Sequence, residues 1–124
     1  MLIVDTGVLV ATADTNDIDH LACRHLLETD PGPLVATAMI IAEAAYMIAR
    51  QIGAEGELGL YTSIIDNALT IEPLTPVDWE RIRTLVDRYS DLPLGGSDAS
   101  LIAIAERLDT TRIATLDHRH FRVV

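Results

Sequence analysis

Short apolar segments of strand-like length alternate with longer helical segments along the whole chain, and this alternation limits the fold more than any other feature. Strands that are joined through helices usually pair in parallel within one sheet. The chain is therefore predicted to be an α/β domain whose central parallel sheet is flanked by helices. The expected strands are Leu2–Asp5, Leu34–Ala36, Leu69–Glu72 and Arg112–Leu116.

Start signals place the helices between these strands. Thr75, Pro76 and Asp78 provide a capping hydroxyl, a first-turn proline and an acid at the third position, which predicts a helix reaching Tyr89. Thr37 is expected to cap the helix that follows the second strand. The other expected helices are Val8–Ala13, Asp19–Thr29, Ala54–Asn67 and Ala99–Leu108.

Length and composition fit one folding unit. With 124 residues and 49% apolar content, the chain can bury a substantial core, and a single domain over 1–124 is expected. Its apolar stretches are too short or too interrupted to span a membrane, and its N-terminus lacks a basic-then-apolar signal pattern. The lone Cys23 excludes an internal disulfide and fits a reducing compartment. A cytoplasmic protein is expected.

Three carboxylates are expected at the carboxyl edge of the sheet. Asp5 and Asp117 each follow an apolar strand, and Asp98 lies in the first turn of a helix that Ser97 is expected to cap. Open parallel sheets bind ligands outside the carboxyl ends of their strands. Taken singly, Asp98 fits a partner of the helix dipole, and Asp5 or Asp117 fits the start of a turn. Taken together, the three favour a shared site.

A fourth carboxylate, Glu43, lies inside the run Ala38–Ala49, which has the pattern of a helix that is apolar on nearly every side. Such a helix is expected to be buried, and its glutamate with it. Met39 and Met47 stand one turn before and after Glu43, so the glutamate has no local structural role. Its position favours a functional role in which it reaches the acidic pocket from the side.

Four gathered carboxylates need a cation, because burial and mutual repulsion both raise the free energy of the charged forms. The chain has no Lys, and none of its nine Arg lies in an apolar run beside these acids. An all-oxygen ligand set favours Mg²⁺ or Mn²⁺, whereas Zn²⁺ favours His and Cys. The alternative zinc set of His20, Cys23 and His25 lies on one expected helix at positions that do not converge.

The net charge of −10 argues against a nucleic-acid ligand at first sight, since phosphate binding is usually driven by clustered basic residues. The charge is uneven, however. Residues 100–124 carry four Arg against three acids, a net +1, while residues 1–99 carry −11. Contact with a phosphate backbone and a merely solvated surface are both open for this segment. The candidate RNA contacts are Arg112, Arg119 and Arg122.

Four short motifs follow one another in an order and spacing that covers essentially the whole chain. They are Asp5-Thr6 after the first strand, Glu43 in the third helix, Gly95-Gly96-Ser97-Asp98-Ala99 before a helix, and Thr115-Leu116-Asp117 near the end. In this order the chain resembles the PIN domain. The segments Leu101–Leu108 and Ile113–Phe121 are especially similar to VapC toxins.

The resemblance implies a PIN-like three-layer fold and a metal-dependent endoribonuclease, the toxin of a VapBC-type toxin–antitoxin pair. It also implies an RNA substrate such as a tRNA or rRNA loop, a VapB-type antitoxin as partner, and a homodimer. Thr6 and Thr115 match hydroxyl positions beside the metal, where they bind water or orient a carboxylate. One or two ions, and Glu43 as ligand or as general base, remain alternatives. The implied metal-holding and catalytic residues are Asp5, Glu43, Asp98 and Asp117.

One position departs from the family pattern. Gly96 stands where a larger apolar residue is common, and it is expected to loosen the loop before Asp98.

Two alternatives belong to other functional classes. Phosphate-handling α/β domains also place acids at parallel strand ends, but they rely on a Lys, which this chain lacks, and the second Asp of the related phosphatases is replaced by Gly7. A catalytically silent PIN-like binding module would hold a structural cation or a basic peptide. Metal binding without turnover of RNA would support that second alternative.

Overall fold

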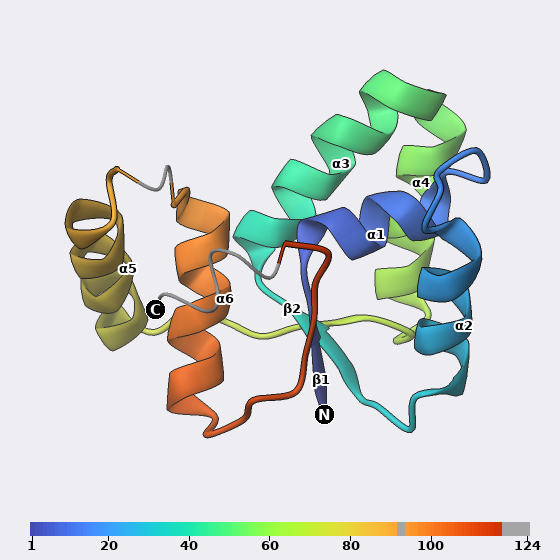
Figure 1. Ribbon diagram of the computed structural model, residues 1–124. Coiled ribbons are helices and arrows are strands. Elements are labelled where there is room, and N and C mark those ends of the chain that lie inside the picture. Colours follow the sequence, from blue (N-terminus) through green and yellow to red (C-terminus); the bar gives the residue numbers. More distant parts are fainter. Residues whose placement is uncertain (92–93, 118–124) are drawn as a thin grey trace.

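The computed structural model describes residues 1–91 and 94–117, and it has the α/β architecture expected from the sequence (Figure 1). Four parallel strands form one sheet in the order β3-β2-β1-β4. At the centre, Ile3 is paired with Val35 on one side and with Ile113 on the other. The strands are β1 (Leu2–Val4), β2 (Leu34–Ala36), β3 (Thr70–Ile71) and β4 (Ile113–Ala114).

Six helices cover the sheet. In Figure 1, α5 and α6 lie on one side of the strands, and α1, α2 and α4 lie on the other. The remaining helix, α3, packs against α1, α4 and α6 and so joins the two sides near the carboxyl ends of the strands. The helices are α1 (Thr6–Ala13), α2 (His20–Thr29), α3 (Ala38–Ile52), α4 (Ala54–Ile65), α5 (Pro76–Arg88) and α6 (Gly96–Arg107).

The core is centred on β1 and α6. All three residues of β1 are buried, and α6 is buried continuously from Ala99 to Ala105, as expected for elements covered on both sides. Ile3, Ile40 and Ile104 are fully enclosed, and each buried side chain of this size stabilises the fold by about 1.5–3 kcal/mol. This packing fixes the strand ends from which the acids project.

Two of the three expected caps are confirmed. Thr37 accepts a hydrogen bond from the amide of Ile40, and Thr75 forms a reciprocal capping box with Asp78. The expected cap by Ser97 is wrong, because α6 begins at Gly96 with Gly95 at the N-cap position. Ser97 therefore lies inside the first turn, and its hydroxyl is directed elsewhere.

Most other differences lie at the ends of elements. The first helix begins at Thr6, directly after β1, because Asp5 is its N-cap. The fourth helix ends at Ile65 rather than Asn67, since Asn67 adopts a left-handed backbone conformation with φ of 61° that ends the helix. The strands β3 and β4 are each two residues long, shorter than expected.

Within the described residues, no helix combines the length and apolar character that crossing a bilayer would require. Two of the candidate RNA-contacting residues, Arg119 and Arg122, lie outside the described part of the chain.

Candidate functional site

The four acids come together at the carboxyl end of the sheet. Asp5 follows β1, Glu43 projects from α3, Asp98 lies in the first turn of α6, and Asp117 follows β4. All four line one pocket of about 310 Å³. Residues far apart in the sequence thus share the place where parallel sheets form ligand crevices. The rest of the lining is Thr6, Gly7, Met47 and Leu116.

Asp5 is the most enclosed of the acids, with only 5% of its surface exposed. One carboxylate oxygen, Oδ1, accepts the amide of Thr6 at 2.8 Å, and Oδ2 accepts the hydroxyl of Thr115 at 2.7 Å. Burial raises the pKa of Asp5 above its usual value of 3.8, the two hydrogen bonds oppose that change, and the nearby charges of Glu43 and Asp117 add to it. The site therefore holds its central carboxylate at an electrostatic cost that a cation would relieve.

Thr115 connects two of the acids. Its Oγ1 donates to Asp5 and accepts the amide of Asp117 at 3.0 Å, so one hydroxyl fixes the carboxylate of the first residue and the backbone of the second. Of the two roles that the resemblance implies for Thr115, binding water or orienting a carboxylate, these contacts are compatible with the second.

Thr6 presents a different feature. Among the described residues, its Oγ1 is the one buried side-chain oxygen or nitrogen without a hydrogen-bond partner, and Thr6 lines the acidic pocket. An orphaned buried hydroxyl normally costs about 1–3 kcal/mol unless water or a ligand satisfies it. The pocket thus contains an unused hydrogen-bonding group beside the buried carboxylate of Asp5.

The expectation that Glu43 is buried is wrong. The third helix buries one stripe against the core, and Glu43 lies on the opposite, exposed face together with Ala42 and Tyr46. The apolar run misled the prediction because several of its residues are alanines, which lie as readily at the surface as in a core. Glu43 therefore faces the pocket from its rim. The buried stripe consists of Ile40, Ile41, Ala44, Ala45 and Ile48.

Ser97 holds Glu43 in place. Its hydroxyl donates to Oε2 of Glu43 at 2.5 Å, across 54 positions of the sequence. The same turn of α6 is tied to α3 a second time, since Ser100 is hydrogen-bonded both to the carbonyl of Ser97 and to the hydroxyl of Thr37. Sequence reasoning assigned Ser97 to a cap and missed this contact. The sequence feature that could have indicated a role for Ser97 in the site was its position directly before Asp98.

The donor set of the pocket fits a hard divalent cation. The pocket lining offers oxygens from four carboxylates and one hydroxyl, the donors that hard cations prefer, and the thioether sulfur of Met47 is the one soft donor in that lining. Over residues 1–91 and 94–117, however, no three Asp, Glu, His or Cys side chains already form a group arranged to hold a metal. The acids share one pocket without forming a closed coordination shell.

A larger cavity of about 500 Å³ lies elsewhere, between α1, α2 and α4. Its only carboxylate is Glu28, which forms an ion pair with Arg24, so this cavity does not gather several acids as the smaller pocket does. The alternative zinc set is not assembled. His20 is buried and bonded through Nδ1 to the carbonyl of Ala11, whereas His25 is exposed on the same helix.

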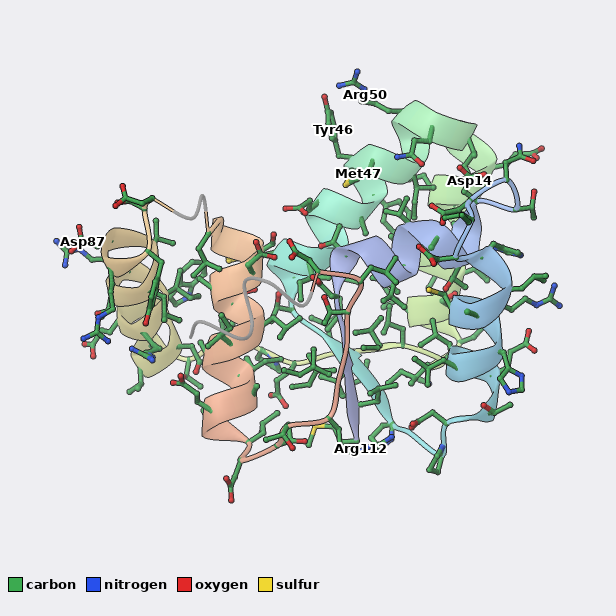
Figure 2. The ribbon with its side chains drawn as sticks, viewed as in Figure 1. Asp14, Tyr46, Met47, Arg50, Asp87 and Arg112 are labelled. Atoms are coloured by element: carbon green, nitrogen blue, oxygen red, sulfur yellow. The ribbon has the colours of Figure 1, made fainter. Side chains whose placement is uncertain are left out.

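Arg112 lies away from the acidic pocket. It precedes β4 at its amino end, where it pairs with Asp30 and donates to the carbonyl of Met1, and its contact with RNA stays a prediction. Figure 2 shows Arg112 at the opposite end of the molecule from Met47, which lines the pocket.

Gly96 belongs to a helix and not to the loop before it. It is the first residue of α6, and a Cβ at this position would lie 2.7 Å from the terminal methyl of Met39. That methyl is the flexible end of its side chain, so it can move aside for a larger residue.

Comparisons with known proteins agree with the fold. The family model described as PIN domain matches residues 2–124. Ribonuclease VapC26 of Mycobacterium tuberculosis is 30% identical over 120 residues, which cover 97% of this chain and 89% of that protein. The crystal structure of M. tuberculosis VapC20, described as a Sarcin-Ricin loop cleaving toxin, superposes with a TM-score of 0.90 at 15% identity, covering 99% of this chain and 95% of that one.

Proposed function

This chain belongs to the PIN domain family, and we infer that it is a VapC-type endoribonuclease, the toxin of a toxin–antitoxin pair. The observation that carries this inference is the convergence of Asp5, Glu43, Asp98 and Asp117 on one pocket at the carboxyl end of the sheet. Phosphate-handling α/β domains fit less well, because the chain contains no Lys to neutralise a bound phosphate.

We propose that the four acids hold Mg²⁺ or Mn²⁺. A divalent ion bound there would lower the pKa of a water molecule and stabilise the charge that develops on the scissile phosphate. The protein supplies the placement of the ligands. Asp5 is fixed by Thr6 and Thr115, so its oxygens enter the site with little freedom left to lose.

Glu43 and Thr6 have distinct roles in this proposal. The Ser97 hydroxyl occupies Oε2 of Glu43, which leaves Oε1 as the oxygen that faces a ligand water or accepts a proton from it. The unpartnered hydroxyl of Thr6 provides a hydrogen bond to a water molecule inside the pocket. Together these groups would orient the attacking water against the phosphate.

The proposed substrate is structured RNA, such as a loop of tRNA or rRNA. Purified protein is expected to cleave such RNA only when Mg²⁺ or Mn²⁺ is present, and Asp98→Asn is expected to lower the rate by at least about a hundredfold. Asp87→Asn serves as the matched control, because Asp87 is exposed on α5 and does not line the pocket (Figure 2). Equal cleavage by wild type and Asp98→Asn would overturn the assignment.

We further propose a VapB-type antitoxin as the cognate partner, a homodimer as the working state, and the cytoplasm as the location. Size-exclusion chromatography with light scattering measures the oligomeric state directly. Coexpression with a candidate VapB-type antitoxin tests the partner, which should restore growth and abolish RNA cleavage.

A further inference from the structure

Next to the acidic pocket, α3 carries a strip of side chains that includes two exposed residues. Met47 lines the pocket, and Tyr46 and Arg50 lie beside it on the outward face of the helix. Figure 2 shows Tyr46 and Arg50 pointing away from the body of the molecule, with Met47 on the same helix. We call Tyr46, Met47 and Arg50 the α3 strip.

Tyr46 presents its ring to solvent although it sits beside the site. It is 62% exposed, so most of the ring is available to a ligand. Its position three residues after Glu43 places the ring on the same side of the helix as the glutamate, about 4.5 Å further along the axis. An exposed aromatic ring next to a phosphate-cleaving pocket fits a base that has left its own stack.

Arg50 provides a positive charge at the far end of the strip. Among the described residues, four of the arginines form ion pairs with carboxylates, and Arg50 is not one of them. It contacts Tyr46 instead, with its guanidinium 5.7 Å from the ring centroid and Nη1 donating to the phenolic oxygen at 3.1 Å. Its charge is therefore available to an anion in a chain whose net charge is −10. The four paired residues are Arg24, Arg81, Arg107 and Arg112.

A second exposed tyrosine, Tyr61, lacks the basic neighbour that Tyr46 has among the residues that the structure describes. Tyr61 on α4 also bonds the side chain one turn before it, but that partner is the carboxylate of Glu57, which raises the pKa of the phenol. Its surroundings are thus acidic, and it does not line the acidic pocket. Tyr46 combines an exposed ring with a guanidinium neighbour and directly precedes Met47, which lines the pocket, whereas the exposed ring of Tyr61 has a carboxylate as its partner.

We propose that the α3 strip binds the nucleotide next to the scissile bond, with its base stacked on Tyr46 and a phosphate held by Arg50. This inference rests on the proposed ribonuclease function and adds a substrate subsite to it. The occupant is single-stranded RNA, because a paired base cannot offer its face to the ring. Arg50 lies seven residues beyond Glu43, roughly 10 Å along the helix, which is within reach of a neighbouring nucleotide.

The test measures RNA binding separately from cleavage. Fluorescence anisotropy with the metal-free protein in EDTA compares a short oligoadenylate with an abasic oligomer of the same length. Tyr46→Ala is expected to weaken oligoadenylate binding by between about fivefold and about a hundredfold, the range for one base stacked on an aromatic ring. The same variant should leave abasic binding unchanged, and Tyr46→Phe should behave as wild type.

Arg50→Gln has a different expected signature. It should weaken the binding of both oligomers and reduce the slope of log affinity against log salt by about 0.7, the value for one phosphate contact on a single strand. Tyr61→Ala and Arg83→Gln are the matched controls, since both residues are exposed and lie away from the pocket. Neither control should change the affinity.

Several results would overturn the proposal. These are unchanged oligoadenylate affinity in Tyr46→Ala, equal losses for the oligoadenylate and the abasic oligomer, or a change of oligomeric state that would instead make the strip a self-association surface. If wild type cleaves RNA while Tyr46→Ala binds normally, only the subsite fails. If wild type neither binds nor cleaves RNA, the ribonuclease function fails with it.

Discussion

Replacing Asp5 with Asn should change stability in opposite directions with and without metal. Asn keeps an oxygen for the amide of Thr6, and its amide group can donate to Oγ1 of Thr115 in place of the bond that Thr115 now donates. The hydrogen-bond geometry therefore survives with one bond reversed. What the substitution removes is the buried negative charge beside Glu43 and Asp117.

The direction of the metal-free effect follows from the pKa of Asp5. Burial raises that pKa above 3.8, so ionising Asp5 costs more in the folded protein than in the unfolded chain. The resulting loss of stability is absent below 3.8 and complete once the pH exceeds the raised pKa. At neutral pH, metal-free Asp5→Asn should consequently have a higher Tm than metal-free wild type.

Metal should reverse this order. An ion at a hundred times its Kd stabilises the folded state by about 2.7 kcal/mol, and each kcal/mol raises the Tm of a domain of this size by roughly 3–5 °C. Wild type should therefore gain about 8–13 °C. If losing one carboxylate weakens binding about a hundredfold, the same metal concentration gives Asp5→Asn only about 0.4 kcal/mol, or about 1–2 °C.

Thermal unfolding followed by circular dichroism, in EDTA and in Mn²⁺, measures all four midpoints. The Asp87→Asn control should match wild type in both conditions. Equal Mn²⁺ shifts for wild type and Asp5→Asn would refute metal binding at Asp5. A lower Tm for Asp5→Asn in EDTA would refute the electrostatic reasoning.

Three further predictions concern positioning and packing. Ser97→Ala should lower the affinity for Mn²⁺ by about tenfold, because it releases the side chain of Glu43, and Ser97→Thr should restore the affinity. Titration calorimetry measures both variants. Full affinity in Ser97→Ala would contradict the positioning role of Ser97. Burial raises the pKa of Asp78, but hydrogen bonds from Thr75 and Arg107 outweigh that effect and hold the pKa below 3.8. The ion pair of Asp78 with Arg107 should therefore stabilise the fold fully above pH 3.8, and this stabilisation should be lost as the pH falls through the lowered pKa. Arg107→Met should lower the free energy of unfolding in urea at neutral pH by about 3 kcal/mol. A negligible loss in that measurement would count against the pair. Gly56→Ala should destabilise the protein by about 1–3 kcal/mol, although Ala favours helices. The reason is that the new Cβ would lie 2.5 Å from the side chain of Ile52 and 2.8 Å from that of Ile48. A stabilised variant would show that these side chains move aside easily.

The sequence predicted the sheet well because its strands are short apolar runs separated by clear punctuation. The bounds of Leu34–Ala36 agree with the structure, and the cap and proline of Thr75-Pro76 lie where expected. The convergence of Asp5 and Asp117 also followed from sequence, since both residues follow strands of a parallel sheet. Local sequence patterns were sufficient where residues close together in the sequence determine the structure.

The errors arose where distant segments decide the structure. The exposure of Glu43 depends on which stripe of α3 meets the core, and an alanine-rich helix does not reveal that stripe. Ser97 could not be assigned to Glu43 from sequence, because 54 positions separate the two residues. Arg112 was grouped with the strand that leads to Asp117, but it lies at the other end of β4, where Asp30 neutralises it. Long-range pairing of charges therefore limited the prediction of the site.

Anomalous diffraction from crystals soaked in Mn²⁺ is the most direct test of the metal centre. The four-carboxylate assignment predicts a peak inside the acidic pocket, within about 2.3 Å of oxygens from Asp5 and at least one of the other three acids. It also predicts that this peak disappears in Asp98→Asn crystals. A peak bound elsewhere, or an unchanged peak in the variant, would contradict the assignment.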